Sequence, residues 1–403
     1  MSQALSPDAR RILAAQAVRA FGYGFAAVSL GALLDRRGLS SLDVGAVLTA
    51  VVAGTVTASL AVGRWADRFG RRRSYVALYL VLALTGLVLA AAAPVWALVL
   101  VALAGGLSTE VVESGPFTSL EQAMLATELA GDERVQGFGV YNAVATAAGS
   151  LGALAAGVPA WLGSDEDRWF VLLVVAGLAG AAVAAALTPT VEAPMRPPGQ
   201  AARLRRSRPT VQRLSVLFAT DSFGGGFVVQ TFIAYWLTAR FDASVGLLGV
   251  VFFAVGVLQT GSFLLAPALA RRYGLLPTMV FTHLPSNLLL AAMAFAPTLP
   301  VAVSLLLARV ALSQMDVPTR QAYVMALVDP DERTPAAAYT NTARYLVRPA
   351  GPLLAGATAN VWLGLPFLVA GTIKATYDLV LWRWFRTVPL PADTSDRAME
   401  VAR

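Results

Sequence analysis

Cysteine is absent from this chain of 403 residues, and histidine occurs once. Without cysteine the chain can form no disulfide, offers no thiolate ligand to a metal and has no cysteine nucleophile. A single histidine cannot build a multi-histidine metal site. The ATP-binding loop G-x-x-x-x-G-K-[ST] and the hydrolase motifs H-E-x-x-H and G-x-S-x-G are also absent. We therefore expect no metal, no cofactor and no enzymatic activity.

Charge is scarce as well. Only 14% of the residues are charged and 57% are hydrophobic, whereas an ordinary soluble domain carries about 25% charged residues. The mean hydropathy is +0.64. A soluble chain of this length needs a polar surface that so few charges cannot supply. The composition therefore predicts an all-α protein that is dissolved in a lipid bilayer and excludes a soluble enzyme.

The charge that is present is mostly basic, with a formal net charge of +7. Nucleic-acid binding would need these cations clustered with aromatic residues on a solvated face. Here most of them lie in short loops between apolar stretches. We therefore expect no nucleic-acid partner.

Twelve apolar stretches are long enough to cross a bilayer, which takes about 20 residues. Pro116 and Pro318 interrupt the fourth and the tenth stretch, so we expect kinks or brief breaks there. The twelve predicted spans are residues 11–34, 43–63, 74–93, 95–128, 134–162, 168–188, 211–238, 243–270, 275–296, 299–328, 333–360 and 363–386.

The distribution of cations predicts the orientation of these spans. With both termini in the cytoplasm, 21 of the 31 cations lie in inside segments, four lie in outside loops and six lie within predicted spans. This bias predicts a multi-pass protein of the cytoplasmic (inner) membrane with both termini cytoplasmic.

The chain divides by composition into two halves that repeat each other. Residues 1–188 form a six-helix bundle, 189–210 a cytoplasmic linker, 211–388 a second six-helix bundle and 389–403 a cytoplasmic tail. The segment FGYGF at 21–25 recurs 202 residues later as FGGGF, and Gly152 recurs 199 residues later as Gly351. Parallel repeats of this kind predict a substrate path at the interface of two pseudo-symmetric bundles.

A loop signature follows the second predicted span, where residues 63–72 read GRWADRFGRR. This segment resembles the signature G-x-x-x-D-R-x-G-R-R of the major facilitator superfamily. The resemblance implies secondary transporters whose two bundles rock around a midplane cavity. It also implies a conformational latch, for which we expect Asp67, Arg68 and Arg72, with Gly63 allowing close helix approach and Gly70 a tight turn. The second copy, ARRYG at 270–274, lacks the acid.

Two departures from the family's proton antiporters weaken an antiport assignment. Their G-x-x-x-G-P-x-x-G-G pattern in the fifth span has no proline here, where residues 149–153 read GSLGA. Their usual arginine in the fourth span has no clear counterpart, because Glu110 and Glu113 occupy that region.

Charged residues inside the spans are the candidate site residues, because a charge at the bilayer centre costs roughly 2.5–3.5 kcal/mol. Glu113 and Glu110 share one helical face and are expected to couple protons, together with Asp221. The alternative, which the sequence leaves open, is that each charge only joins helices through an ion pair, such as Asp316–Arg320 or Lys374–Asp378. The residues expected to bind substrate are Arg19, Asp316, Arg309, Arg320, Asn341, Arg344, Arg348 and Lys374.

Arg19 and Asp221 occupy nearly equivalent positions in the two repeats. A pseudo-twofold axis could therefore bring them together, and we expect both to face the cavity.

The leading functional hypothesis is a monomeric secondary transporter that moves a small organic molecule by alternating access, by proton-coupled efflux. The alternative is a facilitator or symporter for an anionic substrate, carboxylate- or phosphate-like, which the arginines of the second half favour. The expected partners are the substrate, protons and the lipid bilayer.

The two hypotheses predict different effects of one substitution. Glu113→Gln removes a titratable carboxyl and is expected to abolish export driven by an inward proton gradient, whereas an anion facilitator would tolerate it. The measurement is substrate flux in vesicles with and without an imposed pH gradient. Unchanged proton-driven export in this variant would remove Glu113 from the coupling site.

Overall fold

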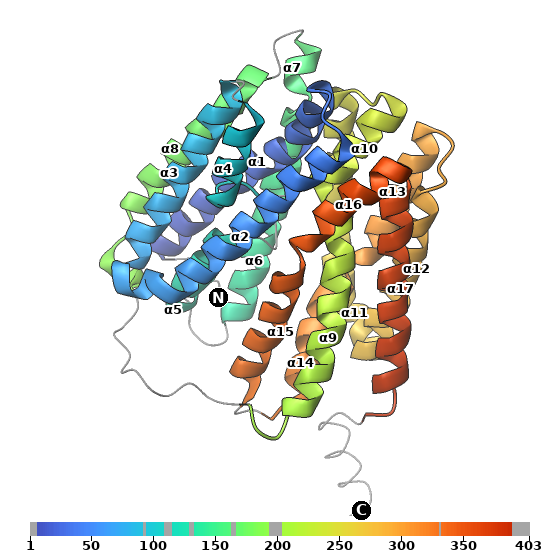
Figure 1. The fold of residues 1–403 in the computed structure, drawn as a ribbon. Helices are drawn as coiled ribbons and strands as arrows, with labels where there is room; N and C mark the ends of the chain where they lie inside the picture. The colour runs from blue at the N-terminus through green and yellow to red at the C-terminus, as the bar shows by residue number, and fades with distance from the viewer. Residues whose placement is uncertain are drawn as a thin grey trace, which may run out of the picture. The chain divides into compact units, whose positions relative to one another are not determined.

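The computed structural model describes residues 6–91, 94–108, 115–128, 133–162, 167–192, 204–329 and 332–388. Within these ranges the chain forms helices and no β-strand (Figure 1). The helices of the amino-terminal part are α1 (Pro7–Arg36), α2 (Ser41–Phe69), α3 (Arg71–Ala90), α4 (Val95–Leu103), α5 (Gly115–Glu128), α6 (Glu133–Ala155), α7 (Val158–Trp161), η1 (Asp167–Phe170), α8 (Val171–Ala185) and η2 (Pro189–Val191). Those of the carboxyl-terminal part are α9 (Arg208–Phe227), α10 (Gln230–Phe241), α11 (Val245–Tyr273), α12 (Leu275–Met293), α13 (Leu299–Ser313), α14 (Asp316–Leu327), α15 (Arg333–Val347), α16 (Ala350–Val361) and α17 (Leu365–Phe385).

The all-α fold predicted from the sequence is confirmed. Six predicted spans coincide with one helix each, namely α1, α2, α3, α11, α12 and α17, and each of the others divides into two helices. Nine stretches of the described chain are long and apolar enough to cross a membrane. The count of twelve spans stays a prediction.

The breaks within spans lie beside prolines and glycines. Pro116 is the second residue of α5 and Pro318 the third residue of α14, so of the two expected outcomes, a kink or a brief break, the structure has the break. A proline is tolerated in the first turn because its missing N–H would have no partner there. The break between α9 and α10 was not predicted; it directly follows the run Gly224–Gly226.

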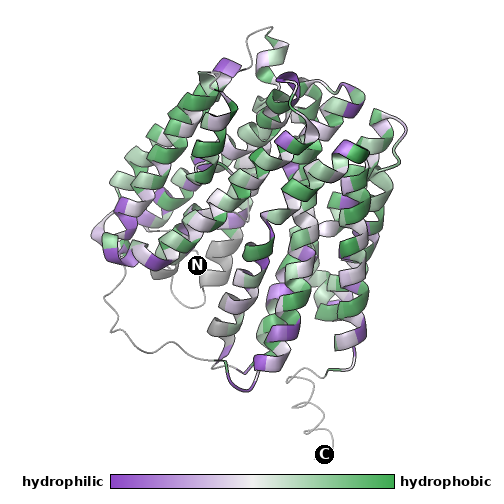
Figure 2. Cartoon of the chain, viewed as in Figure 1, coloured by the Kyte–Doolittle hydropathy of each residue, from purple (hydrophilic) through white to green (hydrophobic). Residues whose placement is uncertain are grey.

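Many large apolar side chains lie on the outside of the helices. On α3, Leu80, Leu84 and Leu87 are 50%, 55% and 57% exposed and share one face. Figure 2 shows hydrophobic residues along the length of the helices, with hydrophilic ones gathered where α2 meets α3. Such stripes are suited to contact with lipid tails and not with water.

The chain divides into two compact units. The first unit comprises residues 1–196 and 229–257, and the second comprises residues 197–228 and 258–403. The first therefore contains α1 to α8, α10 and the beginning of α11, and the second contains α9, the end of α11 and α12 to α17.

In the first unit, α1 packs on α6 at backbone contact. A Cβ atom on Gly152 would lie 1.9 Å from the carbonyl oxygen of Phe21, and one on Gly24 would lie 1.9 Å from that of Gly149. Small residues permit this approach, which stabilises helix pairs in membranes through van der Waals contact.

The second unit repeats this contact between α9 and α16. A Cβ atom on Gly351 would lie 2.5 Å from the Cα atom of Gly226. Gly226 belongs to the FGGGF segment that repeats FGYGF, and Gly351 is the counterpart of Gly152. The repeated glycines of the sequence thus form an equivalent helix contact in each unit.

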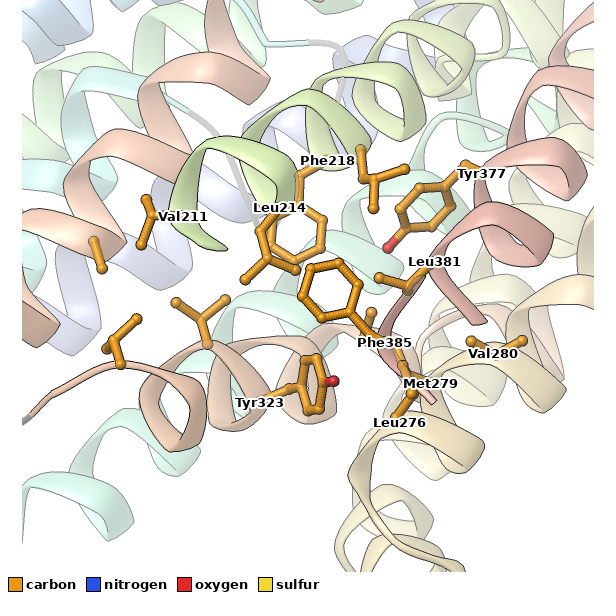
Figure 3. Packing of buried hydrophobic residues seen from close by; sticks show 14 residues of the cluster. Val211, Leu214, Phe218, Leu276, Met279, Val280, Tyr323, Tyr377, Leu381 and Phe385 are labelled. Atoms are coloured by element: carbon orange, nitrogen blue, oxygen red, sulfur yellow. The ribbon is translucent and has the colours of Figure 1, made fainter. Parts of the chain in front are cut away.

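Apolar side chains fill the second unit on one side of this contact. Most of them come from α9, α12, α14 and α17, with Ala336 from α15, and Figure 3 shows the labelled members converging between the four helices. The aromatic members are Phe218, Tyr323, Tyr377 and Phe385. This core holds the four helices that carry the charged residues described below.

The glycine contacts predict that alanine lowers the stability of the protein at Gly152 and Gly351 but not at Gly261. Gly152→Ala and Gly351→Ala place a methyl group against backbone and are expected to destabilise the protein by about 1–3 kcal/mol. Gly261→Ala in α11 is the matched control, because its Cβ would have no atom within 4 Å among the described residues; it should be neutral or stabilising. Thermal unfolding of the purified variants measures this, and equal Tm values for all three would contradict the packing.

Candidate functional site

A fully buried ion pair joins α1 to α5 in the first unit. Nη2 of Arg19 lies 2.7 Å from Oε2 of Glu121, and Nε lies 3.2 Å from Oε1. The side chains are 1% and 0% exposed. Tyr75 donates to Oε1 at 2.8 Å and Tyr141 to Oε2 at 2.7 Å. Each carboxylate oxygen of Glu121 therefore accepts two hydrogen bonds.

Aromatic rings enclose this pair. The guanidinium of Arg19 lies 5.2 Å from the ring centroid of Phe117 and 5.4 Å from that of Tyr23, within the range of cation–π attraction. The four hydrogen bonds that Glu121 accepts therefore hold α1, α3, α5 and α6 together.

The second unit contains a larger set of buried charges, which we call the acid–base cluster. Its members are Asp221 on α9, His283 and Asn287 on α12, Asp316 and Arg320 on α14, and Lys374 and Asp378 on α17. All seven side chains are buried. On each of α12, α14 and α17 the two members are four residues apart, which places them on one face of the helix.

Asp221 is the centre of the cluster. Its Oδ1 atom lies 2.5 Å from Nζ of Lys374, and its Oδ2 atom lies 3.6 Å from Nη1 of Arg320. Nε2 of His283 is 3.9 Å from Oδ1. Gly224 leaves room for Lys374, because a Cβ atom there would lie 2.8 Å from Cγ of the lysine.

Two further acids complete the cluster. Arg320 donates to Asp316 at 2.8 Å, which is the i, i+4 pair suggested by the sequence. Nδ1 of His283 lies 2.9 Å from Oδ1 of Asp378, and Asn287 donates to Oδ2 of Asp378 at 2.8 Å. His283 therefore lies between two acids from different helices, Asp378 on α17 and Asp221 on α9.

Some of the predicted site residues therefore have partners other than those expected. Lys374 binds Asp221 and not Asp378, while Arg19 and Asp221 lie in different units and each has a partner in its own. Glu121 and His283 were not among the predicted site residues. The need of a buried arginine for an acid, and the single histidine inside a span, were the signals for them.

The remaining candidate site residues are not members of the acid–base cluster. Arg309 is on α13 and interacts electrostatically with Asp221 of the cluster. Asn341 on α15 is exposed, whereas Arg344 on the same helix and Arg348, which follows its last residue, are half-buried. Glu110 and Glu113 lie outside the described residues.

The predicted latch segment lies at the turn from α2 to α3. Arg71 donates through Nε to Asp67 at 2.7 Å, and the Asp67 side chain is 68% exposed. Gly70 has φ +97°, a conformation that favours glycine. Arg72 donates to the carbonyl oxygen of Leu187 at 3.1 Å. Arg68 and Gly63 are exposed, and a Cβ atom on Gly63 would have no described atom within 4 Å.

Each unit also has a carboxylate that accepts backbone N–H groups at the start of a helix. Glu192 accepts from Arg71 at 2.6 Å, at the first turn of α3. Glu332 accepts from the backbone of Arg205 at 2.6 Å and from that of Ser207 at 2.8 Å, just before α9.

The backbone hydrogen bonds to Glu332, led by that from Ser207, lower the pKa of its carboxyl to about 2. Because the folded-state pKa is depressed, the stabilisation from Glu332 is complete above the usual value near 4.5 and is lost as the pH falls toward 2. A pH dependence between pH 5 and 8 therefore comes from other groups.

Comparisons with known proteins agree with this architecture. Residues 12–352 match the sequence profile of the family described as Major Facilitator Superfamily. The chain is 24% identical over 418 residues to the uncharacterized membrane protein YJR124C of Saccharomyces cerevisiae, covering 93% of each chain.

Solved structures share the fold at low sequence identity. A mutant of the nucleoside transporter NupG has a TM-score of 0.73 at 15% identity, covering 93% of this chain and 98% of its own. A D-xylose-proton symporter has 0.72 at 16% identity, covering 93% and 97%. The human organic anion transporter MFSD10 (TETRAN) has 0.61 at 17% identity, covering 94% and 99%.

The buried Arg19–Glu121 pair predicts that a single conservative substitution strongly lowers the stability of the protein. Glu121→Gln leaves the Arg19 charge buried without its counter-ion and is expected to destabilise the protein by about 3–5 kcal/mol. The double variant Arg19→Met/Glu121→Leu removes both charges and should be more stable than Glu121→Gln alone. Thermal unfolding measures both.

Asp67→Asn is the control, because its pair with Arg71 also has a 2.7 Å separation but an exposed acid. It should change stability by about 1 kcal/mol or less. Equal losses for Glu121→Gln and Asp67→Asn would contradict a special role for the buried pair.

Proposed function

Because this chain belongs to the Major Facilitator Superfamily and is a multi-pass membrane transporter, we propose that it moves a small organic molecule by alternating access and couples this movement to protons. The observation that carries the proposal is the acid–base cluster of the second unit. Ionisable residues within membrane spans mark substrate paths and proton relays.

His283 is the group that we propose to take up the proton. In the tautomer in which Nδ1 donates to Asp378, Nε2 is the nitrogen that is left to bind a second proton, and it lies 3.9 Å from Asp221. An imidazole titrates within the physiological pH range more readily than any other unperturbed side chain. Its protonation would bring Asp221 a further cationic neighbour beside Lys374 and Arg320 and so change which groups hold α9 to α12, α14 and α17.

The buried pair of the first unit is unsuited to the same task. Glu121 accepts four hydrogen bonds, from Arg19, Tyr75 and Tyr141. A proton on this carboxyl would replace a charge-assisted bond and leave Arg19 without a counter-ion, at a large free-energy cost. We assign this pair a structural role and retain Glu113 and Glu110 as further candidates for proton coupling.

Direction and orientation are part of the proposal. Efflux by proton antiport across the cytoplasmic membrane is its first form, with a monomer whose termini are cytoplasmic, as the distribution of arginines favours. Asp67, Arg68 and Arg72 at the α2–α3 turn would latch one conformation. The second form is cotransport of an anion with a proton, which Arg309 favours. One structural neighbour is described as an organic anion transporter.

Proton coupling is tested in proteoliposomes that contain an internal pH dye. A panel of organic cations, neutral sugars and nucleosides, and carboxylates is added in turn, and substrate-dependent proton movement is recorded. We expect proton movement with at least one class of compound. His283→Gln and Asp378→Asn should reduce it at least tenfold, whereas Asp329→Asn, an exposed acid of the same unit, should not.

Exchange of substrate without a pH gradient should survive in His283→Gln, which shows that the variant still folds and binds. No proton movement with any compound, or full proton movement in both cluster variants, would contradict the proposal.

A further inference from the structure

Arg309 on α13 is half-buried, and among the described residues its guanidinium has no counter-ion within 4.0 Å. Its Nε atom is inaccessible and makes no hydrogen bond to any of them. Asp221 is the acid that interacts with it electrostatically over a longer distance. Asp221 is already engaged by Lys374 and Arg320.

Arg309 lies on the inner face of its helix. Ala302, Leu306 and Ser313 are buried. Position 309 follows Leu306 by three residues and precedes Ser313 by four, so it lies on the same face of α13. Ten residues separate Arg309 from the start of α13 at Leu299, a distance of roughly 15 Å along the axis. The side chain is therefore far from the helix end to which a lipid-exposed arginine would extend.

The charges around His283 balance in one protonation state only. Arg309, Arg320 and Lys374 carry three positive charges, and Asp221, Asp316 and Asp378 carry three negative charges. With neutral His283 the sum is zero, and with protonated His283 it is one positive charge. The polar and charged side chains around His283 come from four helices. They are Asp378, Lys374 and Tyr377 of α17, Asp221 of α9, Asp316 and Arg320 of α14, and Asn287 of α12 itself.

We propose that Arg309 binds the carboxylate of a monovalent organic acid, and that this anion travels together with one proton held at His283. The planar guanidinium matches a carboxylate through two parallel hydrogen bonds. A single negative charge neutralises the protonated cluster, so the loaded carrier has no net charge in this region. Binding of the anion and of the proton then favour each other, as linkage requires.

This inference rests on the proposed proton coupling and selects cotransport over antiport. The probes are three carboxylates with their neutral amides, namely acetate and acetamide, lactate and lactamide, and benzoate and benzamide. Thermal stabilisation of the purified protein reports binding, because a ligand that binds the folded state raises Tm. At least one carboxylate should raise Tm at pH 6, and its amide should not.

The variants separate the contribution of Arg309 from a general effect of charge. Arg309→Gln should weaken apparent carboxylate affinity by about tenfold or more, and Arg309→Lys should retain part of it. Arg271→Gln, at an exposed position of α11, should bind as the wild type does. His283→Gln should bind carboxylate with the same affinity at pH 6 and pH 8, whereas the wild type should bind more tightly at pH 6.

The inference is overturned if no carboxylate stabilises the protein, if amides stabilise it equally, or if Arg309→Gln and Arg309→Lys both bind as the wild type does. The proteoliposome assay distinguishes this failure from failure of the proposed function. Protons that move with cations or neutral compounds but not with carboxylates would leave proton coupling intact and refute the anion site. Binding of phosphate monoesters in place of carboxylates at pH 8 would also refute it, since at that pH their second charge leaves the protonated cluster negative.

Discussion

A charge inside a lipid bilayer has to be neutralised where it lies, because water is absent and the cost of an unpaired ion is several kcal/mol. Both units obey this constraint, but in different ways. In the first, Arg19 and Glu121 neutralise each other, and tyrosine hydroxyls complete the hydrogen bonds of the acid. In the second, the charges of the acid–base cluster balance collectively once Arg309 on α13 is counted with them. A pair whose acid already accepts four hydrogen bonds holds helices in place, whereas a shared balance changes when one proton or one anion is added.

The packing of each unit allows these charges to meet. The glycine contacts of α1 with α6 and of α9 with α16 bring backbones together without intervening side chains. Gly224 has a second role, because the absence of its side chain admits Lys374 next to Asp221. Apolar residues of α9, α12, α14 and α17 pack beside the cluster and fix the helix faces on which its members stand (Figure 3). The segment that repeats in the sequence thus both packs the unit and positions its charges.

The fold class could be predicted from composition and periodicity, because lipid solvation demands apolar helices of known length. The partners of buried charges were harder to predict. Spacing along one helix correctly indicates Asp316–Arg320, since four residues are one turn. The same spacing suggests Lys374–Asp378, and there the structure differs, because Asp221 and His283 from other helices lie closer. Helix breaks such as that after Gly226 depend on tertiary packing, which periodicity along a single segment does not encode.

The proposed proton coupling depends on one proton held at His283, between Asp378 and Asp221. As the only histidine of the chain, it gives a single imidazole signal in the tag-free protein labelled with ¹⁵N-histidine. Nuclear magnetic resonance should show this imidazole changing protonation across the pH range in which transport changes. The transition should move in Asp378→Asn and on addition of a carboxylate that stabilises the protein. An imidazole that keeps one protonation state throughout that range would contradict the account.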